Sequence, residues 1–391
     1  MTDYVVRASC EPTRILSDNG IRKALALELI RITPAFDPVK DTKRIQPASL
    51  DVKLHCVDES APINPRSGYS PFVPQGTEHT LRAGYISTIH LSELVDFGQF
   101  TPDRLRLLGV FSEARSSVRR LGGYMENHGA YFFSDQKRSH LELGNFGPND
   151  IRCAPNDRIA QLFFTVIPYS EYLLGAGNTR AVHDYREKIQ SLDTGTEVTS
   201  NEELRRLHKD GHLGVTPRLH TCNGAILVHA GDVAYRMRRV PDGIDFNKRD
   251  TYSREELLEP LFIKKGYTVK EGEHVIVETQ EPFALSPHVG IRFWDNLHWS
   301  DFHNTRSMPS ANIETVVGNL KMCTLTDGWI DPGYNGGFSR QPKWLTGRHI
   351  KTGDILGVGQ VFHFPKGVGK EYGDAKLGSQ YNKTQQTQFA K

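Results

Sequence analysis

Polar and apolar residues alternate along much of the chain, which is the pattern of strands that bury one face. Residues 49–54 alternate in this way, and residues 80–86 predict a strand, a turn at a glycine and a second strand. Residues 159–167 form an almost continuous apolar run, which predicts a core strand. Ser17 is a good N-cap, and the apolar spacing after it predicts a helix over 18–30. The pattern therefore indicates a mainly β fold with a few short helices.

The later part of the chain echoes the earlier part. A polar run at 181–209 is typical of an exposed helical connector, and a second β-rich region follows it. Short stretches of the second region resemble the first: 267–272 resembles 79–84, 225–229 resembles 50–54, Gly353-Asp354 resembles Asn156-Asp157, and Arg306-Ser307 resembles Arg115-Ser116. An echo at half the chain length indicates a duplicated domain.

We therefore predict two tandem jelly-roll-like β domains, at 1–175 and 216–391, with a helical and polar connector at 176–215 between them. The second copy departs from the first at two places. It carries the turn-rich sequence 328–336, which the first copy lacks, and it has Gln341 where the first copy has Glu142. An amide cannot act as a base, so the second copy is expected to be degenerate.

Composition narrows the class of protein. The chain has 391 residues, and its 35 glycines and 21 prolines favour a turn-rich β fold over a helix bundle. A net charge of only +2 argues against a general nucleic-acid coat, so any anion site must be local. Neither a signal peptide nor an apolar run long enough to span a bilayer is found. The five cysteines never form a Cys-x-x-Cys pair, which predicts a reducing, cytoplasmic location: Cys10, Cys56, Cys153, Cys222 and Cys323.

Two neighbouring stretches carry candidate chemistry. Residues 115–120 hold three arginines and two serines, and arginine forks and hydroxyls match phosphate oxygens. Alternation through 140–143 places Glu142 on one face of a strand and Leu141 and Leu143 on the other, where a half-buried carboxylate can act as general acid and base. A phosphate clamp beside such a carboxylate indicates a nucleotide enzyme. The alternative is a salt-bridged surface loop followed by an ordinary strand, with Arg119 a solvated charge.

The order of these motifs resembles the dCTP deaminase branch of the dUTP diphosphatase-like trimers. The matching motifs are Ile15-Leu16-Ser17-Asp18, residues 45–51, Arg115-Ser116-Ser117 with Arg120-Leu121-Gly122, Leu141-Glu142, Ile330-Asp331-Pro332-Gly333-Tyr334, and the tail from Tyr372 to Tyr381. The resemblance covers most of the chain and is split across two repeats. The chain is thus similar to the double-length, fused-repeat form of the family. It implies a homo-oligomer, expected to be a trimer, with sites between neighbouring subunits.

The resemblance also implies roles for individual residues. Glu142 would be the general acid and base, with Ser116 and Arg120 as fixed donors. The substrate would contact Arg115, Ser117, His140, Leu141, Asp331, Tyr334, Tyr372, Gln380 and Gln385. The last two stand at or near positions where the family has a lysine and a glutamine. Because the clamp and the acid lie in the first copy and Asp331 and Tyr372 in the second, a composite site is expected.

Deamination of cytosine needs attack of water at C4 and a proton for the leaving amine. The zinc route uses His-x-Glu followed by Pro-Cys-x-x-Cys, and the second element is missing here. The metal-free route uses a carboxylate and fixed donors. We therefore predict no protein-bound zinc or other metal, with Mg²⁺ carried by the triphosphate of the substrate.

Three functions remain open at this stage. The first is deamination of dCTP to dUTP and ammonia in pyrimidine deoxynucleotide metabolism. The second is a dUTP-cleaving or bifunctional enzyme, and the third is a non-catalytic nucleotide-binding regulatory protein. In all three the partner is a small nucleotide, with no nucleic acid and no membrane.

Overall fold

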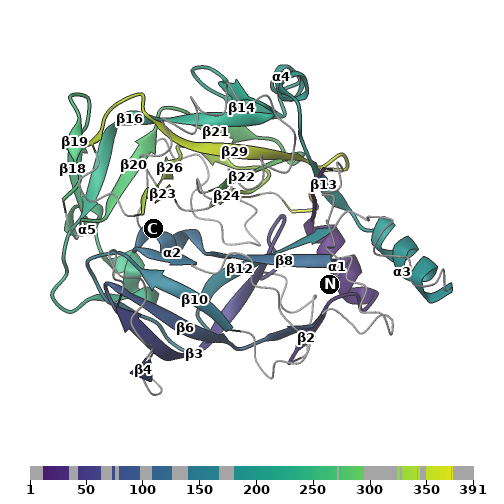
Figure 1. Ribbon diagram of the computed structural model, residues 1–391, viewed down its shortest axis with the longest axis horizontal. Helices are drawn as coiled ribbons and strands as arrows, with labels where there is room; N and C mark the ends of the chain where they lie inside the picture. Colours follow the sequence, from purple (N-terminus) through teal and green to yellow (C-terminus); the bar gives the residue numbers. More distant parts are fainter. Residues whose placement is uncertain are drawn as a thin grey trace, which may run out of the picture.

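Two β layers face each other in the computed structural model (Figure 1). The structure describes residues 12–34, 43–62, 73–74, 79–96, 108–125, 140–166, 180–270, 273–294, 324–325, 328–340, 342–343, 349–370 and 372. We call residues 12–166 the N-terminal half, which forms the lower layer, and residues 213–372 the C-terminal half, which forms the upper layer. The predicted mainly β fold with a few short helices is confirmed.

The strands of the N-terminal half are mostly short. They are β1 (Arg14–Leu16), β2 (Arg31–Thr33), β3 (Leu50–Pro62), β4 (Val73–Pro74), β5 (Thr80–Leu81), β6 (Tyr85–Leu91), β7 (Leu94–Asp96), β8 (Leu108–Ala114), β9 (Gly123–Met125), β10 (His140–Asn145), β11 (Ile151–Arg152) and β12 (Arg158–Val166). The longest of them are β3 and β12. The predicted core strand is β12, and the predicted strand–turn–strand is β5 and β6, with Gly84 at φ 77° between them.

The C-terminal half is built in the same manner. Its strands are β14 (Leu213–Val215), β15 (Thr221–Cys222), β16 (Ala225–Met237), β17 (Ile244–Asp245), β18 (Leu258–Phe262), β19 (Tyr267–Thr268), β20 (Val275–Thr279), β21 (Phe283–Leu285), β22 (Val289–Trp294), β23 (Thr324–Leu325), β24 (Gly328–Ile330), β25 (Asn335–Gly336), β26 (Ser339–Arg340), β27 (Pro342–Lys343), β28 (His349–Ile350) and β29 (Ile355–His363).

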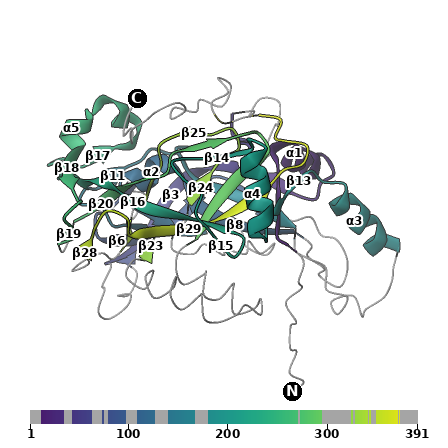
Figure 2. The same cartoon turned by 90° about the horizontal axis from the view of Figure 1, so that it is seen from above.

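The helices are α1 (Asp18–Ala26), α2 (Ser116–Arg120), α3 (Arg180–Gln190), α4 (Asn201–Lys209) and α5 (Arg254–Leu257), with a 3₁₀ turn at Phe246–Thr251. Most of the helices lie at the edges of the layers, whereas α2 lies between the two layers (Figure 1). Figure 2 shows α3 projecting from one end of the body and α4 lying beside β14. None of the helices in the described ranges is both long and apolar enough to cross a membrane.

The two halves use the same strand pairings. In the N-terminal half, β6 pairs with β3 and β10, and β12 pairs with β3 and β8. In the C-terminal half, β20 pairs with β16 and β26, and β29 pairs with β16 and β22. Even the short pairs correspond, since β5 with β11 matches β19 with β28. The order of these strands along the chain is also the same in both halves.

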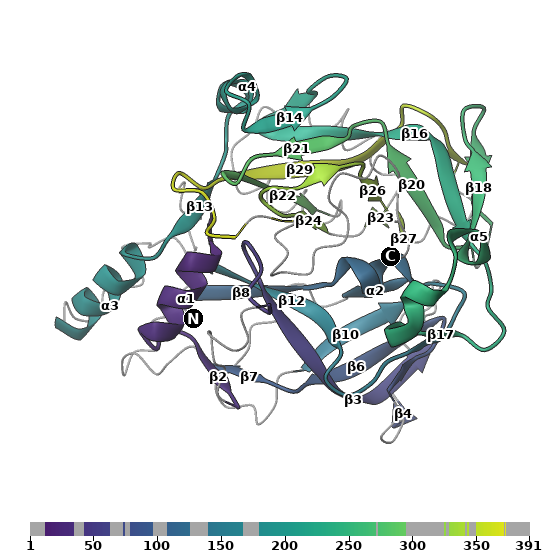
Figure 3. The same ribbon diagram turned by 180° about the vertical axis from the view of Figure 1, so that it is seen from behind.

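A short seam joins the two layers. Strand β1 pairs with β12 of its own half and with β13 (Thr194–Glu197), and β13 pairs with β29 of the other half. Figure 3 shows this seam beside α1. The predicted connector 181–209 is thus two helices with a strand between them, because the residues of β13 join a sheet edge that periodicity alone does not reveal.

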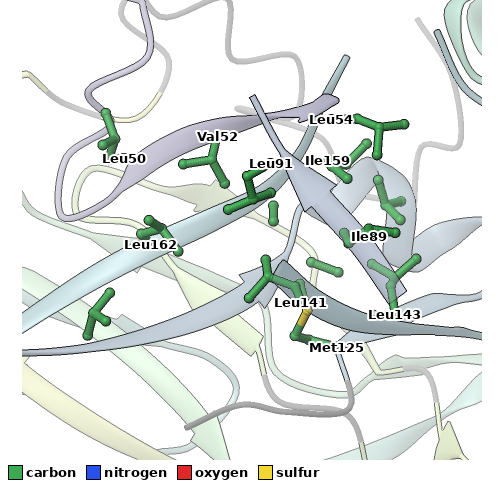
Figure 4. Close-up of a cluster of buried hydrophobic side chains, with 14 of the residues drawn as sticks. Leu50, Val52, Leu54, Ile89, Leu91, Met125, Leu141, Leu143, Ile159 and Leu162 are labelled. Carbon is green, nitrogen blue, oxygen red and sulfur yellow. The ribbon is translucent and has the colours of Figure 1, made fainter. Parts of the chain in front are cut away.

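One apolar core fills the N-terminal half and also includes residues of the C-terminal half, among them Met237, Ile244 and Ile276, while a second core lies mostly within the C-terminal half. The core of the N-terminal half lies between its strands, where side chains from β3, β6, β9, β10 and β12 meet (Figure 4). The predicted helix over 18–30 is shorter than expected, because Glu28 adopts φ 56°. That left-handed residue ends the helix and lets Leu29 and Ile30 turn into this core.

Candidate active site

The arginine and serine cluster 115–120 lies where β8 ends and α2 begins. Arg115 is the extended residue at the start of α2, and Ser116 is exposed while Ser117 and Arg120 are half-buried. Gly122, at φ 102°, ends this turn against the backbone of Gly147. A Cβ at Gly122 would lie 2.4 Å from the Gly147 nitrogen, so this position needs glycine to keep the cluster close to β10.

Asp51 orients the first arginine of the cluster. Its side chain is fully buried on β3, and its Oδ2 lies 3.4 Å from Arg115 Nη1 and 3.2 Å from Arg158 Nη1. Arg44 donates to the backbone oxygen of Asp51 and forms a buried ion pair with Glu93. Asp51 has no role predicted from the sequence, although it lies in the stretch 45–51 that resembles the family.

Arg119 is not the solvated charge that the sequence suggested. Its side chain is 11% exposed, and its Nη1 lies 3.6 Å from Oε2 of the buried Glu113. Arg292 of the C-terminal half lies 3.6 Å from the other oxygen of Glu113, and its guanidinium sits 3.5 Å from the centre of the Phe111 ring. Arg119 is instead paired with a buried carboxylate in the region where the two halves join.

The turn of the C-terminal half reaches this same region. The Trp329 ring lies 5.2 Å from the Phe163 ring, within an apolar cluster contributed by both halves. A Cβ at Gly328 would lie 3.0 Å from Nη1 of Arg119. The turn that begins at β24 therefore lies directly against the end of α2, so the two halves are in contact there.

The pKa of the Asp331 carboxyl is strongly shifted. It is 9% exposed and accepts a hydrogen bond from Trp329 Nε1 at 2.9 Å. Its pKa is raised from the ordinary 3.8 to about 7, chiefly because burial disfavours the charged form. The negative charges of Asp51 and Glu113 also raise this pKa, while the Trp329 hydrogen bond and the Arg115 charge lower it. Groups from both halves thus act on one carboxyl.

Two neighbouring tyrosines of the C-terminal half lie near the arginine and serine cluster. Tyr334 lies two residues after the Pro332 of the turn, and burial raises the pKa of its phenol, whereas the nearby charge of Arg120 lowers it. The Tyr372 ring lies 5.3 Å from the Tyr334 ring, and the Tyr372 backbone N–H donates to the Pro332 oxygen at 2.9 Å. The predicted catalytic residue Arg120 therefore lies near Tyr334, and the predicted substrate-binding residues Tyr334 and Tyr372 are neighbours.

Glu142 lies in the middle of β10 with the alternation that the sequence predicted. Leu141 and Leu143 are fully buried in the N-terminal core, and Glu142 is half-buried on the opposite face. Gly144 pairs with Tyr124 of β9, so Glu142 and Tyr124 share that face. The Tyr124 hydroxyl lies 3.3 Å from His274 Nε2 of the C-terminal half. The Glu142 face of the sheet is thus the one turned toward the C-terminal half.

Some predicted residues cannot be placed. His140 begins β10, opposite His90, but its side chain lies outside the described residues, as do Gln341, Gln380, Gln385 and the stretch with Arg306 and Ser307. Among the described residues, no three His, Cys, Asp or Glu side chains form a group that could hold a metal ion. The described cysteines, Cys56, Cys153 and Cys222, form no disulfide with one another.

Two known proteins that are similar to this chain are both dCTP deaminases. No protein-family model matches the chain. A dUMP-forming dCTP deaminase of Methanosphaera stadtmanae is 28% identical over 202 residues, a match that covers 48% of this chain and 94% of that protein. The crystal structure of the 2'-deoxycytidine 5'-triphosphate deaminase of Agrobacterium tumefaciens superposes with a TM-score of 0.61 at 15% identity, covering 91% of this chain and 99% of that chain. The chain is thus a distant relative of dCTP deaminases in sequence, and it shares the fold of one of them in structure.

Proposed function

We propose that this chain hydrolytically deaminates dCTP to dUTP and ammonia in a site to which both of its halves contribute. The observation that carries the proposal is the contact between the arginine and serine cluster at 115–120 and the Gly328–Tyr334 turn. Across this contact, the charge of Arg115 lowers the pKa of Asp331 and the charge of Arg120 lowers the pKa of Tyr334. A distant sequence relative and a solved structure with the same fold, both dCTP deaminases, support it.

In this proposal the cluster binds the triphosphate. Arg115 and Arg120 offer guanidinium forks, and Ser116 and Ser117 offer hydroxyl donors. The buried Asp51 restricts Arg115 to one orientation, which lowers the entropy that binding would otherwise cost. Mg²⁺ arrives bound to the triphosphate oxygens of the substrate and offsets part of their charge.

The C-terminal half would bind the nucleoside. Asp331 accepts a hydrogen bond from the deoxyribose hydroxyl, while Tyr334 and Tyr372 cover the sugar and the base. The backbone of His140 and Leu141 contacts the base edge, and Gln380 and Gln385 complete the cover from the tail. Since Asp331 is buried and already holds the Trp329 N–H, its carboxyl has a fixed position for this contact.

Glu142 would carry the proton transfers. The carboxylate takes a proton from water as the oxygen attacks C4, and passes it to N3 of the ring. A second proton from the water then reaches the amine through the same carboxyl, and the C4–N bond breaks to release ammonia. Ser116 and Arg120 act as fixed donors that stabilise the charge which develops during attack.

Product analysis tests the proposal. Purified protein is incubated with dCTP or dUTP, each with Mg²⁺, and ammonia, pyrophosphate and nucleotides are quantified separately. Ammonia and dUTP from dCTP, without pyrophosphate, is the expected result. Binding of dCTP without any product would contradict the enzyme assignment and favour a nucleotide-sensing protein.

A second candidate activity is the conversion of dCTP to dUMP, ammonia and pyrophosphate. It is favoured by the sequence relative, whose name describes a dUMP-forming enzyme. Ammonia and pyrophosphate in equal amounts from dCTP would establish this activity instead. Pyrophosphate from dUTP alone would indicate a diphosphatase.

The proposed organisation is a fused pair of similar β domains that assembles as a homo-oligomer, which we propose to be a trimer. The matched strand pairings of the two halves support the duplication. The sequence relative also supports it, since a match to 94% of that protein uses only 48% of this chain. Light scattering on the eluting protein measures the oligomer mass, for which three times 44.1 kDa is expected.

A further inference from the structure

The motif Ile15-Leu16-Ser17-Asp18 has no part in the proposed catalytic steps, yet its last residue is held in an unusual place. Asp18 is the first residue of α1 and is 1% exposed. Ser17 already caps the helix, because its hydroxyl accepts from the Gly20 N–H at 3.1 Å. The cap therefore does not explain why a carboxylate is buried at the next position.

Asp18 contacts two segments that are far from it in sequence. Its Oδ1 accepts a hydrogen bond from the Gly369 N–H at 2.8 Å, and its own N–H donates to the Pro47 oxygen at 2.9 Å. The contact with Gly369 is close: a Cβ at Gly369 would lie 3.0 Å from Asp18 Oδ2 and 2.9 Å from Asn19 Oδ1. One buried residue thus joins the start of α1 to the chain before Asp51 and to the chain after β29.

Both of these segments lead to the candidate site. Four residues after Pro47 comes Asp51, which lies 3.4 Å from Arg115. Three residues after Gly369 comes Tyr372, whose N–H donates to Pro332 and whose ring lies beside Tyr334. Asp18 therefore contacts the segment that leads to Asp51 through its main-chain N–H, and the segment that leads to Tyr372 through its carboxylate.

The segment from Phe364 to Tyr372 has other supports as well. The Phe364 N–H donates to the His288 oxygen at 2.7 Å, and the Val368 N–H donates to the Pro287 oxygen at 3.0 Å. Of these contacts and the one with Asp18, the contact with Asp18 is nearest to Tyr372 in sequence. Loss of the Asp18 carboxylate should therefore loosen the end of the segment without detaching its beginning.

We propose that Asp18 is a positioning residue that fixes the segment 364–372 over the candidate site and so sets the affinity for the nucleotide. This proposal rests on the function proposed above. It assigns a role to a residue that touches neither the substrate nor the reacting atoms, and it predicts an effect on KM with little effect on kcat.

Three variants of the full chain test it. Asp18→Ala removes the acceptor, Asp18→Asn keeps an acceptor oxygen at the same place, and Gly369→Ala presses a methyl group against Asp18 and Asn19 from the other side. Glu202→Ala is the matched control, because it removes a first-turn carboxylate from α4 instead. Thermal unfolding of each variant shows whether the fold is kept.

Two measurements are made on each variant. The first is the rate of tryptic cleavage at Lys366 and Lys370, followed by mass spectrometry, which needs no substrate. The second is the KM and kcat for dCTP. Asp18→Ala and Gly369→Ala are expected to speed cleavage and to raise KM about tenfold, the size of one hydrogen bond to a charged group. Asp18→Asn and Glu202→Ala should stay close to wild type.

The outcomes are distinguishable. Unchanged cleavage in Asp18→Ala would overturn the proposal whether or not the chain deaminates dCTP. Faster cleavage with an unchanged KM in an active enzyme would also overturn it, because the segment would then not serve the site. A wild-type protein that leaves dCTP intact would refute the proposed function, and faster cleavage in Asp18→Ala would in that case still support the anchor.

Discussion

The two halves of the chain share a framework but differ in their chemistry. The pairings of β3, β6, β8, β10 and β12 recur as those of β16, β20, β22, β26 and β29. The arginine and serine cluster and Glu142 belong to the N-terminal half, whereas Asp331, Tyr334 and Tyr372 belong to the other. Since main-chain hydrogen bonds set the pairing, side chains at the site can diverge while the sheets stay the same.

The difference is sharpest at β10 and its counterpart β26, so the largest expected effect is there. Glu142→Gln should lower kcat for dCTP by about 1,000-fold, within the range for loss of a general acid and base. Binding of dCTP, measured by calorimetry, should persist. Glu255→Gln, an exposed carboxylate on α5 of the C-terminal half, is the control. Retained turnover in Glu142→Gln would show that Glu142 does not carry the proton transfers, and that the halves do not differ in this respect.

The next effect concerns the contact that joins the halves. Glu113→Gln leaves Arg119 and Arg292 without their shared negative charge in a buried place, so the free energy of unfolding should fall by about 3 kcal/mol. Urea denaturation measures this change. Glu203→Gln, which removes an ion pair from the surface of α4, should cost roughly 0–1 kcal/mol. Equal losses of unfolding free energy in the two variants would show that the buried Glu113 contact stabilises the fold no more than a surface ion pair does.

A smaller effect is expected from the clamp of the N-terminal half. Arg120→Ala should raise KM for dCTP by about 10- to 100-fold, because a charge-assisted contact with the triphosphate is lost. Arg152→Ala, at an exposed position on β11, should leave KM unchanged. Steady-state kinetics of both variants decide the matter, and an unaltered KM in Arg120→Ala would place the clamp elsewhere.

A pH dependence of stability is expected from the C-terminal half. Because the pKa of Asp331 is about 7 in the folded chain and 3.8 ordinarily, the folded state holds this proton between those pH values and the unfolded state does not. The contribution of Asp331 to stability is therefore complete below pH 3.8 and is lost as pH rises through about 7. Asp331→Asn should flatten this part of the profile of melting temperature against pH, and a slope equal to that of wild type would contradict the assignment.

The sequence was informative wherever a local pattern has a local cause. A continuous apolar run predicted β12, and alternation predicted the β5–β6 turn and the position of Glu142 on the face opposite Leu141 and Leu143, because each depends on neighbours within a few residues. The end of α1 was missed, since the left-handed Glu28 serves the packing of Leu29 and not helix propensity. Similar stretches in the two parts of the sequence predicted a duplication, but the extent to which strand pairings recur could not be predicted from them.

The parts of the site that were missed depend on contacts between distant residues. Glu113, Arg119 and Arg292 are separated by up to 179 positions, and no spacing rule connects them. The role of Asp51 is hidden for the same reason, because a lone carboxylate in an alternating strand looks like any polar outward residue. Burial of charge is a property of the assembled halves, so the sequence of either half taken alone does not show it.

The carboxylate of Glu113 also bears on how such a chain could be divided. A cut within the segment that carries α3 would leave Glu113 on one fragment and Arg292 on the other, and would expose the ring of Trp329 to water. Neither fragment is therefore expected to be stable on its own. Two genes encoding the pieces would have to be expressed together, and their products should behave as the subunits of an obligate heterodimer.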